Sequence, residues 1–306
     1  MELSQIRYFS VLAKQQHFTR AAETLHITQP ALSKAISNLE KELGVELFDR
    51  VGKQIFLNSA GQMFLAEITP ILGDLEDVKT RMADLSLGVH GELSIGATFP
   101  VETSSVIQNY LRNFFREHPA VSQRTYMYDQ ARIENLLIEY SLEFGLTLSM
   151  PNKEGIRWNR LLTERLGIVV GKSHPLAKRK TIRLAEVANE RFLCNISAPD
   201  DHDSARFICK MAGYIPNVVY EGNDTPLISQ LVAEGYGVTM MPEEKYYEYR
   251  VTTGEPIWQK DLCYLHVEEE FCQRPIYLLY RDRQHESAMI QAFKEGLIAH
   301  IEQQRH

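Results

Sequence analysis

The feature that most constrains this chain is a pair of short helical patterns near its N-terminus, separated by only a few residues. The first covers residues 18–25, and its inward-facing positions are Phe18, Ala21, Ala22 and Leu25. The second extends from near Pro30 to Gly44, and its inward-facing positions are Leu32, Ile36, Leu39 and Leu43. Because small residues in the first helix allow the second to pack closely, the pattern predicts a helix-turn-helix.

The ends of the second helix carry suitable residues. Thr28 is an expected N-cap, and Pro30 is tolerated in a first helical turn. Gly44 suits the position after the last helical residue, because glycine readily adopts the left-handed conformation. A further helix is predicted over residues 3–15, and its apolar face consists of Leu3, Ile6, Phe9 (or Tyr8), Val11 and Leu12.

A helix-turn-helix leaves the start of its second helix exposed. In this chain that stretch offers amide and hydroxyl groups for base edges or phosphates, together with one cation. With the start of the preceding helix included, the predicted DNA contacts are Thr19, Arg20, Thr28, Gln29, Pro30, Ser33, Lys34 and Ser37.

A β-hairpin is predicted directly after Gly44. Residues 45–50 and 55–58 have the character of strands, and a glycine-containing turn separates them. Arg50 and Lys53 lie near the tip of this wing and are added to the predicted DNA contacts. The pattern leaves one alternative open, a three-helix protein-interaction module with a solvated hairpin.

The same residues carry a resemblance to a known family. The run from Phe18 to Arg50 includes Ala21-Ala22-x-x-Leu25-x-Ile27-Thr28-Gln29-Pro30-Ala31-Leu32-Ser33, and it continues as Lys53-x-x-x-Leu57-Asn58-x-Ala60-Gly61. This segment closely resembles the LysR-type transcriptional regulators. Three positions depart from the family pattern, with a conservative replacement at each: Thr28 for serine, Lys53 for arginine and Asn58 for threonine.

A long helix with a narrow apolar strip is predicted over residues 59–87. Its apolar residues alternate at spacings of four and three, which is the pattern of a coiled-coil seam: Phe64, Ile68, Ile71, Leu75, Val78, Met82 and Leu85. Charged residues surround the strip, so a dimer seam is favoured over the alternative of a single buried core helix. Pro70 predicts a kink. The seam resembles the family's linker helix, and two linked copies are what a helix-turn-helix protein needs to read two half-sites.

Beyond a glycine-containing hinge at residues 88–91, strand-like and helix-like segments alternate, which indicates an α/β architecture with mostly parallel sheets. Strands are predicted over residues 92–97, 122–128, 143–149, 166–171, 191–196, 217–221, 237–241 and 274–281. Helices are predicted over residues 103–117, 130–140, 202–212, 225–234 and 286–304.

The chain is expected to cross between two subdomains near residues 162 and 268. This layout resembles the periplasmic-binding-protein-like effector domain of the LysR-type family, which consists of two Rossmann-like subdomains. The predicted organisation is a winged helix-turn-helix over 1–60, a linker helix over 59–88, subdomain I over 92–162 plus 268–306, and subdomain II over 163–267.

Ligands of open α/β sheets bind at the carboxyl ends of strands, beside helix N-termini. The family resemblance places the effector in the cleft between the subdomains. Together they give the predicted effector site: Thr98, Phe99, Pro100, Thr103, Tyr128, Asp129, Thr147, Ser149, Ile196, Ser197, Ala198, Asp203, Asn223, Asp224 and Thr225.

This set admits more than one interpretation. Thr103, Asp203 and Thr225 are equally well explained as simple N-caps. The set contains three aspartates but no arginine or lysine, so no guanidinium fork for a carboxylate is visible. Either helix N-termini bind an anionic effector without a cation, or the effector is neutral or cationic.

Bulk properties exclude several other classes of protein. The net charge is −7, but residues 1–60 are near +1 and the remainder near −8, which is compatible with DNA contact through a few placed charges. No apolar run is long enough to span a bilayer, and no signal peptide is visible, so we expect a cytoplasmic protein without membrane association. That expectation disfavours a standalone solute-binding protein.

No catalytic signature appears, whether a phosphate loop, a nucleophile elbow or a zinc-protease motif. We therefore expect neither enzymatic activity nor a cofactor or metal. The chain has four cysteines and no C-x-x-C pair: Cys194, Cys209, Cys263 and Cys272. Because some members of the family switch through a disulfide, a redox sensor using Cys194 and Cys209 stays open as an alternative.

The sequence thus predicts a sequence-specific transcriptional regulator whose binding to a pseudo-palindromic double-stranded operator responds to a small molecule. The family resemblance implies a homodimer or a homotetramer, with RNA polymerase as a further partner. Effector binding is expected to close the cleft and to change the angle between the subdomains.

Overall fold

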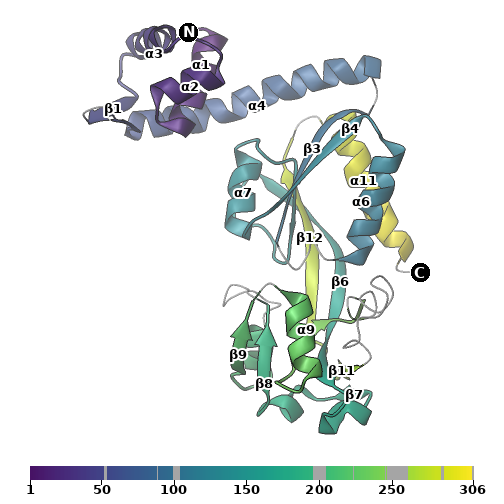
Figure 1. Ribbon diagram of the computed structural model, residues 1–306. Helices are drawn as coiled ribbons and strands as arrows, with labels where there is room; N and C mark the ends of the chain where they lie inside the picture. Colours follow the sequence, from purple (N-terminus) through teal and green to yellow (C-terminus); the bar gives the residue numbers. More distant parts are fainter. Residues whose placement is uncertain are drawn as a thin grey trace. The chain divides into compact units, whose positions relative to one another are not determined.

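The computed structural model describes residues 1–51, 54–87, 89–98, 104–195, 205–222, 224–244, 246, 261–283 and 286–304. The chain divides into two compact units (Figure 1). The first is built mainly on Met1–Gly88, and the second contains most of the remaining chain. They are described separately.

The N-terminal unit is a winged helix-turn-helix, as predicted. Its elements, in chain order, are α1 (Leu3–Gln15), α2 (Phe18–Thr24), α3 (Gln29–Leu43), β1 (Phe48–Val51), β2 (Gln54–Leu57) and α4 (Ser59–Leu87). The hairpin is antiparallel and pairs Phe48 with Leu57. Its first strand begins three residues later than expected, because Leu47 is drawn back toward α3: the Glu40 carboxylate accepts a 2.9 Å bond from the Leu47 N–H.

One core holds this unit together. Phe9 of α1 is fully buried, and its ring centroid lies 5.5 Å from that of Phe48 and 5.1 Å from that of Phe64. Leu32 and Leu39 of α3 are fully buried in the same cluster. Helices, wing and the start of α4 therefore share one apolar centre.

The predicted caps are present. Thr28 Oγ1 accepts a bond from the Ala31 N–H, and Gly44 follows α3 in the left-handed conformation at φ 72°. Asn58 precedes α4, where its Oδ1 accepts from the Gly61 N–H and its Nδ2 donates to the Glu46 carbonyl, both at 2.9 Å. The α4 helix continues through Pro70 without an interruption in its assignment.

The second unit is the α/β effector domain. Its first half contains β3 (Gly91–Ala97), α6 (Ser105–Glu117), β4 (Val121–Met127), α7 (Gln130–Ile138) and β5 (Phe144–Thr147). Near the end of the chain, β12 (Gln273–Arg281) and α11 (Ala288–Gln304) join this subdomain. Figure 1 shows α6 and α11 on one face of the sheet and α7 on the other, and each helix buries apolar residues against it.

The second half of the effector domain contains a further set of strands and helices. In chain order these are the 3-10 turns Pro175–Lys178 and Leu184–Val187 on either side of β7 (Thr181–Ile182), then β8 (Arg191–Cys194), α8 (Ala205–Met211), β9 (Asn217–Glu221), α9 (Thr225–Ala233), β10 (Thr239–Pro242) and β11 (Leu262–Val267). Strands β8 and β9 form a separate parallel pair.

A single long strand, β6 (Ile156–Gly171), links the two subdomains. Its first ten residues pair with β12, and residues 166–171 pair with β10 and β11. The sequence analysis recognised only residues 166–171, because the burial of the first half does not alternate regularly along the strand. It also missed β7 and β11.

The expectation of mostly parallel sheets is only half right. The main sheet has the order β4-β3-β5-β12-β6-β11-β7, and β10 also pairs with β6. Strands β3, β4 and β5 are parallel, but β6 is antiparallel to β10, β11 and β12. The strands that connect the subdomains must pass between them in opposite directions, which imposes the antiparallel pairing.

A buried ion pair lies where β6 changes partners. The Arg274 Nε donates to the Glu164 carboxylate at 2.6 Å, and both side chains are almost fully buried. Because an unpaired charge at such a position is costly, each residue depends on the other.

Candidate DNA-binding surface and effector site

The α3 helix has one packed face and one open face. Leu32, Ile36 and Leu39 are buried at 0–1% exposure. The opposite face carries the predicted DNA contacts: Thr28, Gln29, Pro30 and Lys34 are exposed, and Ser33 and Ser37 are partly exposed. Thr19 and Arg20 are exposed on the neighbouring α2. Packing therefore leaves this amide- and hydroxyl-rich face available for a ligand.

The wing is described only in part. The backbone of Arg50 lies in β1, opposite Ile55. The Arg50 side chain and the whole of Lys53 lie outside the described residues. Their assignment as DNA contacts stays a prediction.

The predicted dimer seam divides into two parts. Ile68 is 2% exposed and Phe64 packs on Phe9, so both belong to the core of their own unit. Farther along α4, Ile71, Val78 and Met82 are exposed at 59%, 44% and 63%. Leu75 is partly buried, and the Leu85 side chain lies outside the described residues. Only the exposed part is open to a second chain.

Two unpaired hydroxyl groups flank the segment that follows β3. Thr98 directly follows this strand, and its Oγ1 is buried. Ser104 is the N-cap residue of α6 and is only 2% exposed. Neither hydroxyl has a hydrogen-bond partner within the described part of the chain. The predicted residues Phe99, Pro100 and Thr103 lie outside that part, and the helix begins at Ser105 rather than at 103 as expected.

Three of the remaining predicted residues in this subdomain have contacts within it. The Asp129 carboxylate accepts a 2.8 Å bond from the Arg132 N–H at the start of α7. Thr147 is fully buried, and its hydroxyl donates to the Ser149 carbonyl at 2.9 Å. Tyr128 is exposed and stacks on Tyr126. These contacts favour structural roles for Asp129 and Thr147.

In the second subdomain, the N-cap of α9 is Asp224 rather than Thr225. The Asp224 carboxylate accepts a 3.0 Å bond from the Leu227 N–H. Thr225 is 4% exposed, and its hydroxyl contacts the Asn195 side chain at 3.4 Å. The other predicted residues lie outside the described residues: Ile196, Ser197, Ala198, Asp203 and Asn223.

A side-chain contact joins the two subdomains. The Ser105 hydroxyl, in the first turn of α6, donates to the Glu244 carboxylate at 3.3 Å. Glu244 follows β10 of the other subdomain. The sequence analysis selected neither residue. The serine pair before an apolar helix was a usable signal for Ser104 and Ser105, but nothing local marked Glu244, which lies 139 residues away.

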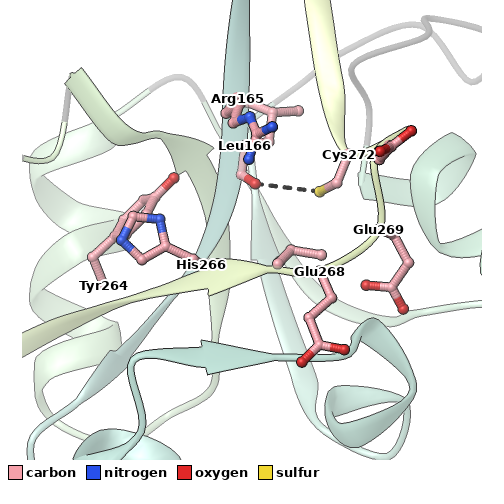
Figure 2. A pocket seen from close by; sticks show the side chains of 9 residues that line it. Arg165, Leu166, Tyr264, His266, Glu268, Glu269 and Cys272 are labelled. Carbon is pink, nitrogen blue, oxygen red and sulfur yellow. Dashed lines mark hydrogen bonds between the residues drawn. The ribbon is translucent and has the colours of Figure 1, made fainter.

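A separate pocket lies beside the point where β6 changes partners (Figure 2). It is lined by Arg165, Leu166, Tyr264, His266, Val267, Glu268, Glu269, Glu270 and Cys272. Two of its groups are engaged by the backbone: Glu269 accepts from the Leu184 N–H, and Cys272 Sγ donates to the Leu166 carbonyl at 3.4 Å. None of these residues belongs to the predicted effector site.

The cysteines lie mostly in the core of the second subdomain. Cys194, Cys209 and Cys272 are buried, and Cys263 is partly exposed. Burial raises the pKa of the Cys194 thiol to about 12 and that of the Cys209 thiol to about 11. At neutral pH both groups are therefore held as thiols, which react poorly with oxidants.

Other classes of site were sought within the residues that the structure describes. These residues contain no cluster of histidine, cysteine and acidic side chains able to hold a metal ion. Among the same residues, no helix combines the length and the apolar character needed to cross a membrane.

Comparisons with known proteins agree with this architecture. Residues 3–62 match the bacterial regulatory helix-turn-helix model of the lysR family, and residues 86–302 match the LysR substrate binding domain. YybE, an uncharacterized HTH-type transcriptional regulator of Bacillus subtilis (strain 168), is 30% identical over 98% of this chain and 99% of its own length. GltC, a transcriptional dual regulator of the same organism, is 34% identical over 84% of this chain and 86% of its own.

Solved structures share the fold. A full-length OxyR variant from Pseudomonas aeruginosa aligns with a TM-score of 0.73 and 20% identity, covering 98% of this chain and 94% of its own. Full-length CbnR complexed with its target DNA aligns with a TM-score of 0.57 and 24% identity, covering 98% and 100%. This chain belongs to the LysR family and is a DNA-binding transcriptional regulator with an effector-binding domain.

Proposed function

We propose that this regulator binds a pseudo-palindromic operator sequence-specifically as a homodimer or homotetramer, and that a small-molecule effector held between its subdomains modulates this binding. The open face of α3 supports the DNA contacts, since it presents Gln29 and Lys34 to solvent. The exposed Ile71, Val78 and Met82 support self-association along α4, because a lone helix gains by covering such a strip. RNA polymerase remains a further partner in this proposal, and the cytoplasm its location.

The observation that carries the effector site is the pair of unpaired hydroxyls at Thr98 and Ser104. A buried polar group without a partner costs about 1–3 kcal/mol. These two groups lie at the carboxyl end of β3 and the start of α6, where open α/β sheets bind ligands. A bound effector would supply the missing partners.

The Ser105–Glu244 contact supports a coupling between this site and the arrangement of the subdomains. An effector that contacts residues of both subdomains would stabilise one arrangement over others. Because the family's DNA-binding heads are joined through linker helices, a change in this arrangement would shift the population of assemblies that fit a given operator.

The DNA contacts are tested with fluorescence anisotropy on an operator selected from a random DNA library and on a random duplex. Gln29→Ala should weaken binding to the operator while leaving binding to random DNA nearly unchanged, since it removes a base contact worth about 1–3 kcal/mol. Arg50→Ala should weaken both and reduce the slope of affinity against salt concentration. Equal losses for Gln29→Ala on both duplexes, or an unchanged salt slope for Arg50→Ala, would contradict these roles.

The effector site is tested by thermal shift of the full chain against amino acids, carboxylates, amines, sugars and nucleosides. A compound that binds the native state should raise the melting temperature in a concentration-dependent way. Ser104→Ala should reduce that shift. Ser122→Ala is the matched control, because Ser122 is an exposed serine of β4 outside the proposed site.

A redox switch through Cys194 and Cys209 is the less favoured function. Some of the relatives and solved structures compared carry hydrogen peroxide or OxyR in their descriptions, but the buried thiols of this chain argue against a rapid reaction. Operator binding should therefore be unchanged after brief exposure to hydrogen peroxide. Loss of binding that Cys194→Ala prevents would establish the redox function instead.

A further inference from the structure

The N-terminus of α6 is suited to an anion. This helix has 13 residues, its N-cap Ser104 makes no side-chain capping bond, and no acidic residue lies in its first turn. The first N–H groups of a helix lack intrahelical partners and carry a partial positive charge. The Ser104 hydroxyl, in a residue only 2% exposed and unpaired among the described residues, adds a donor at the same point. A carboxylate is the small organic anion that such donors bind.

A negative charge from the other subdomain lies beside this anion site. The Glu244 carboxylate accepts the Ser105 hydroxyl at 3.3 Å. A carboxylate offers roughly four acceptor positions, so one hydroxyl leaves it able to accept a charged donor as well. Its neighbour Glu243 is directed elsewhere, toward His266, with 3.7 Å between the carboxylate and the imidazole.

The remaining charges near these groups are acidic or neutral. The described residues of the predicted effector site contain Asp129 and Asp224 but neither lysine nor arginine. A simple dicarboxylate would therefore meet Glu244 without a compensating cation, and like charges at close range are unfavourable. A simple amine would leave the start of α6 and the Ser104 hydroxyl without an acceptor.

A small zwitterion satisfies both groups at once. We propose that the effector of this regulator is an α-amino acid, whose carboxylate binds the start of α6 and whose ammonium binds the Glu244 carboxylate. The proposal rests on the proposed function, since it specifies the ligand class of the same site. It also gives Glu244 a role in linking the subdomains through the ligand.

The experiment uses calorimetric titration of the full chain with the twenty common amino acids, each compared with its matched analogues. For phenylalanine these are 3-phenylpropionate, which lacks the ammonium, and phenethylamine, which lacks the carboxylate. Glutamate and glutarate form a second matched pair. We expect one amino acid or a related group of them to bind, and both analogues to bind at least about tenfold more weakly, as the loss of a charged hydrogen bond predicts.

Glu244→Gln separates a ligand contact from a structural role. This variant should weaken binding of the amino acid about tenfold and leave its deaminated analogue unchanged or improved. Glu243→Gln, the adjacent acidic residue, should alter neither. Ser104→Ala should weaken both carboxylate-bearing compounds and spare the discrimination between them.

The outcomes distinguish the two levels of the proposal. Deaminated carboxylates that bind as tightly as the amino acids, or a discrimination that Glu244→Gln leaves intact, would overturn the zwitterion while the effector function stands. Binding of a sugar or nucleoside, with no amino acid bound, would have the same meaning. If no compound of any class bound the full chain, both the zwitterion and the proposed effector function would fail.

Discussion

The DNA-binding unit and the effector domain are built on contacts of different sequence range. In the N-terminal unit, Asn58 reaches back twelve residues to the Glu46 carbonyl, and Thr28 caps the helix that it precedes. In the effector domain, Glu164 and Arg274 are 110 residues apart, and Ser105 and Glu244 are 139 apart. The comparison teaches that the DNA-reading surface is specified locally, whereas the ligand-sensing surface exists only after distant strands have paired.

The largest expected effect concerns the long-range side of this comparison. Arg274→Met should lower the free energy of unfolding by about 3–5 kcal/mol, because it leaves the buried Glu164 carboxylate unpaired. The double variant Glu164→Met with Arg274→Met should recover most of that loss. Urea unfolding followed by tryptophan fluorescence is the measurement, since Trp158 and Trp258 both lie outside the N-terminal unit.

The matched control is the exposed pair of Arg157 and Asp282, whose closest nitrogen–oxygen distance is also 2.6 Å. Arg157→Met should change stability very little, because solvent screens exposed ion pairs. If it were as costly as Arg274→Met, burial at the crossover would not be the reason for the effect.

The second effect separates the two units by pH. Burial raises the pKa of the Cys194 and Cys272 thiols to about 12 from an ordinary value of 9.0. Folding therefore favours the neutral thiols, and this stability is fully present below pH 9 and is lost as pH rises toward 12. The loss should be on the order of 1 kcal/mol per thiol per pH unit in that window.

Melting of the effector domain, followed by tryptophan fluorescence from about pH 8 to about pH 10.5, measures this effect. Cys194→Ala should make the melting temperature less sensitive to pH. The N-terminal 88 residues contain no cysteine and provide the internal control. Rapid reaction of all four cysteines with a thiol reagent at about pH 8 would show that the three buried thiols are not protected.

A smaller effect tests the local side. Asn58→Ala should destabilise the N-terminal unit by about 1 kcal/mol, because it removes the N-cap of α4. Asn58→Asp keeps an acceptor for the Gly61 N–H and should recover much of the loss. Hydrogen exchange of the first turn of α4 in the full chain measures both. Increased exchange in the effector domain instead would contradict a local role.

The smallest effect lies in the turn of the helix-turn-helix. His26 adopts the left-handed conformation at φ 55°, which glycine adopts without steric cost. His26→Gly should raise the stability of this unit by a few tenths of a kcal/mol, up to about 1 kcal/mol. Ala35→Gly, in the interior of α3, should lower it by about 1 kcal/mol. Circular dichroism of thermal unfolding distinguishes the two signs.

Much of the fold follows from patterns within short windows. The repeat of Leu32, Ile36 and Leu39 predicted the recognition helix, and Thr28 and Gly44 predicted both of its ends. Most strands and helices of the effector domain were also placed within a few residues. The long strand β6 was not, because its two halves pack in different subdomains and present no single period.

The candidate effector site was predicted less completely. The rule that ligands bind at the carboxyl ends of strands selected Thr98, but it also selected Asp129 and Asp224, whose carboxylates cap helices. Glu244 carried no signal of its own. Its position beside Ser105 depends on the path of the chain through both subdomains.

The sequence by itself determined the DNA-binding architecture, the class of the effector domain and the residues open on the recognition helix. It could do so because caps, turns and helical periodicity are decided by neighbours within a few residues. Only the tertiary structure decided where β6 changes partners, which charges are buried together, and which acidic residue meets the start of α6. Those outcomes depend on strands far apart in the chain, and no local pattern records which of them will pair.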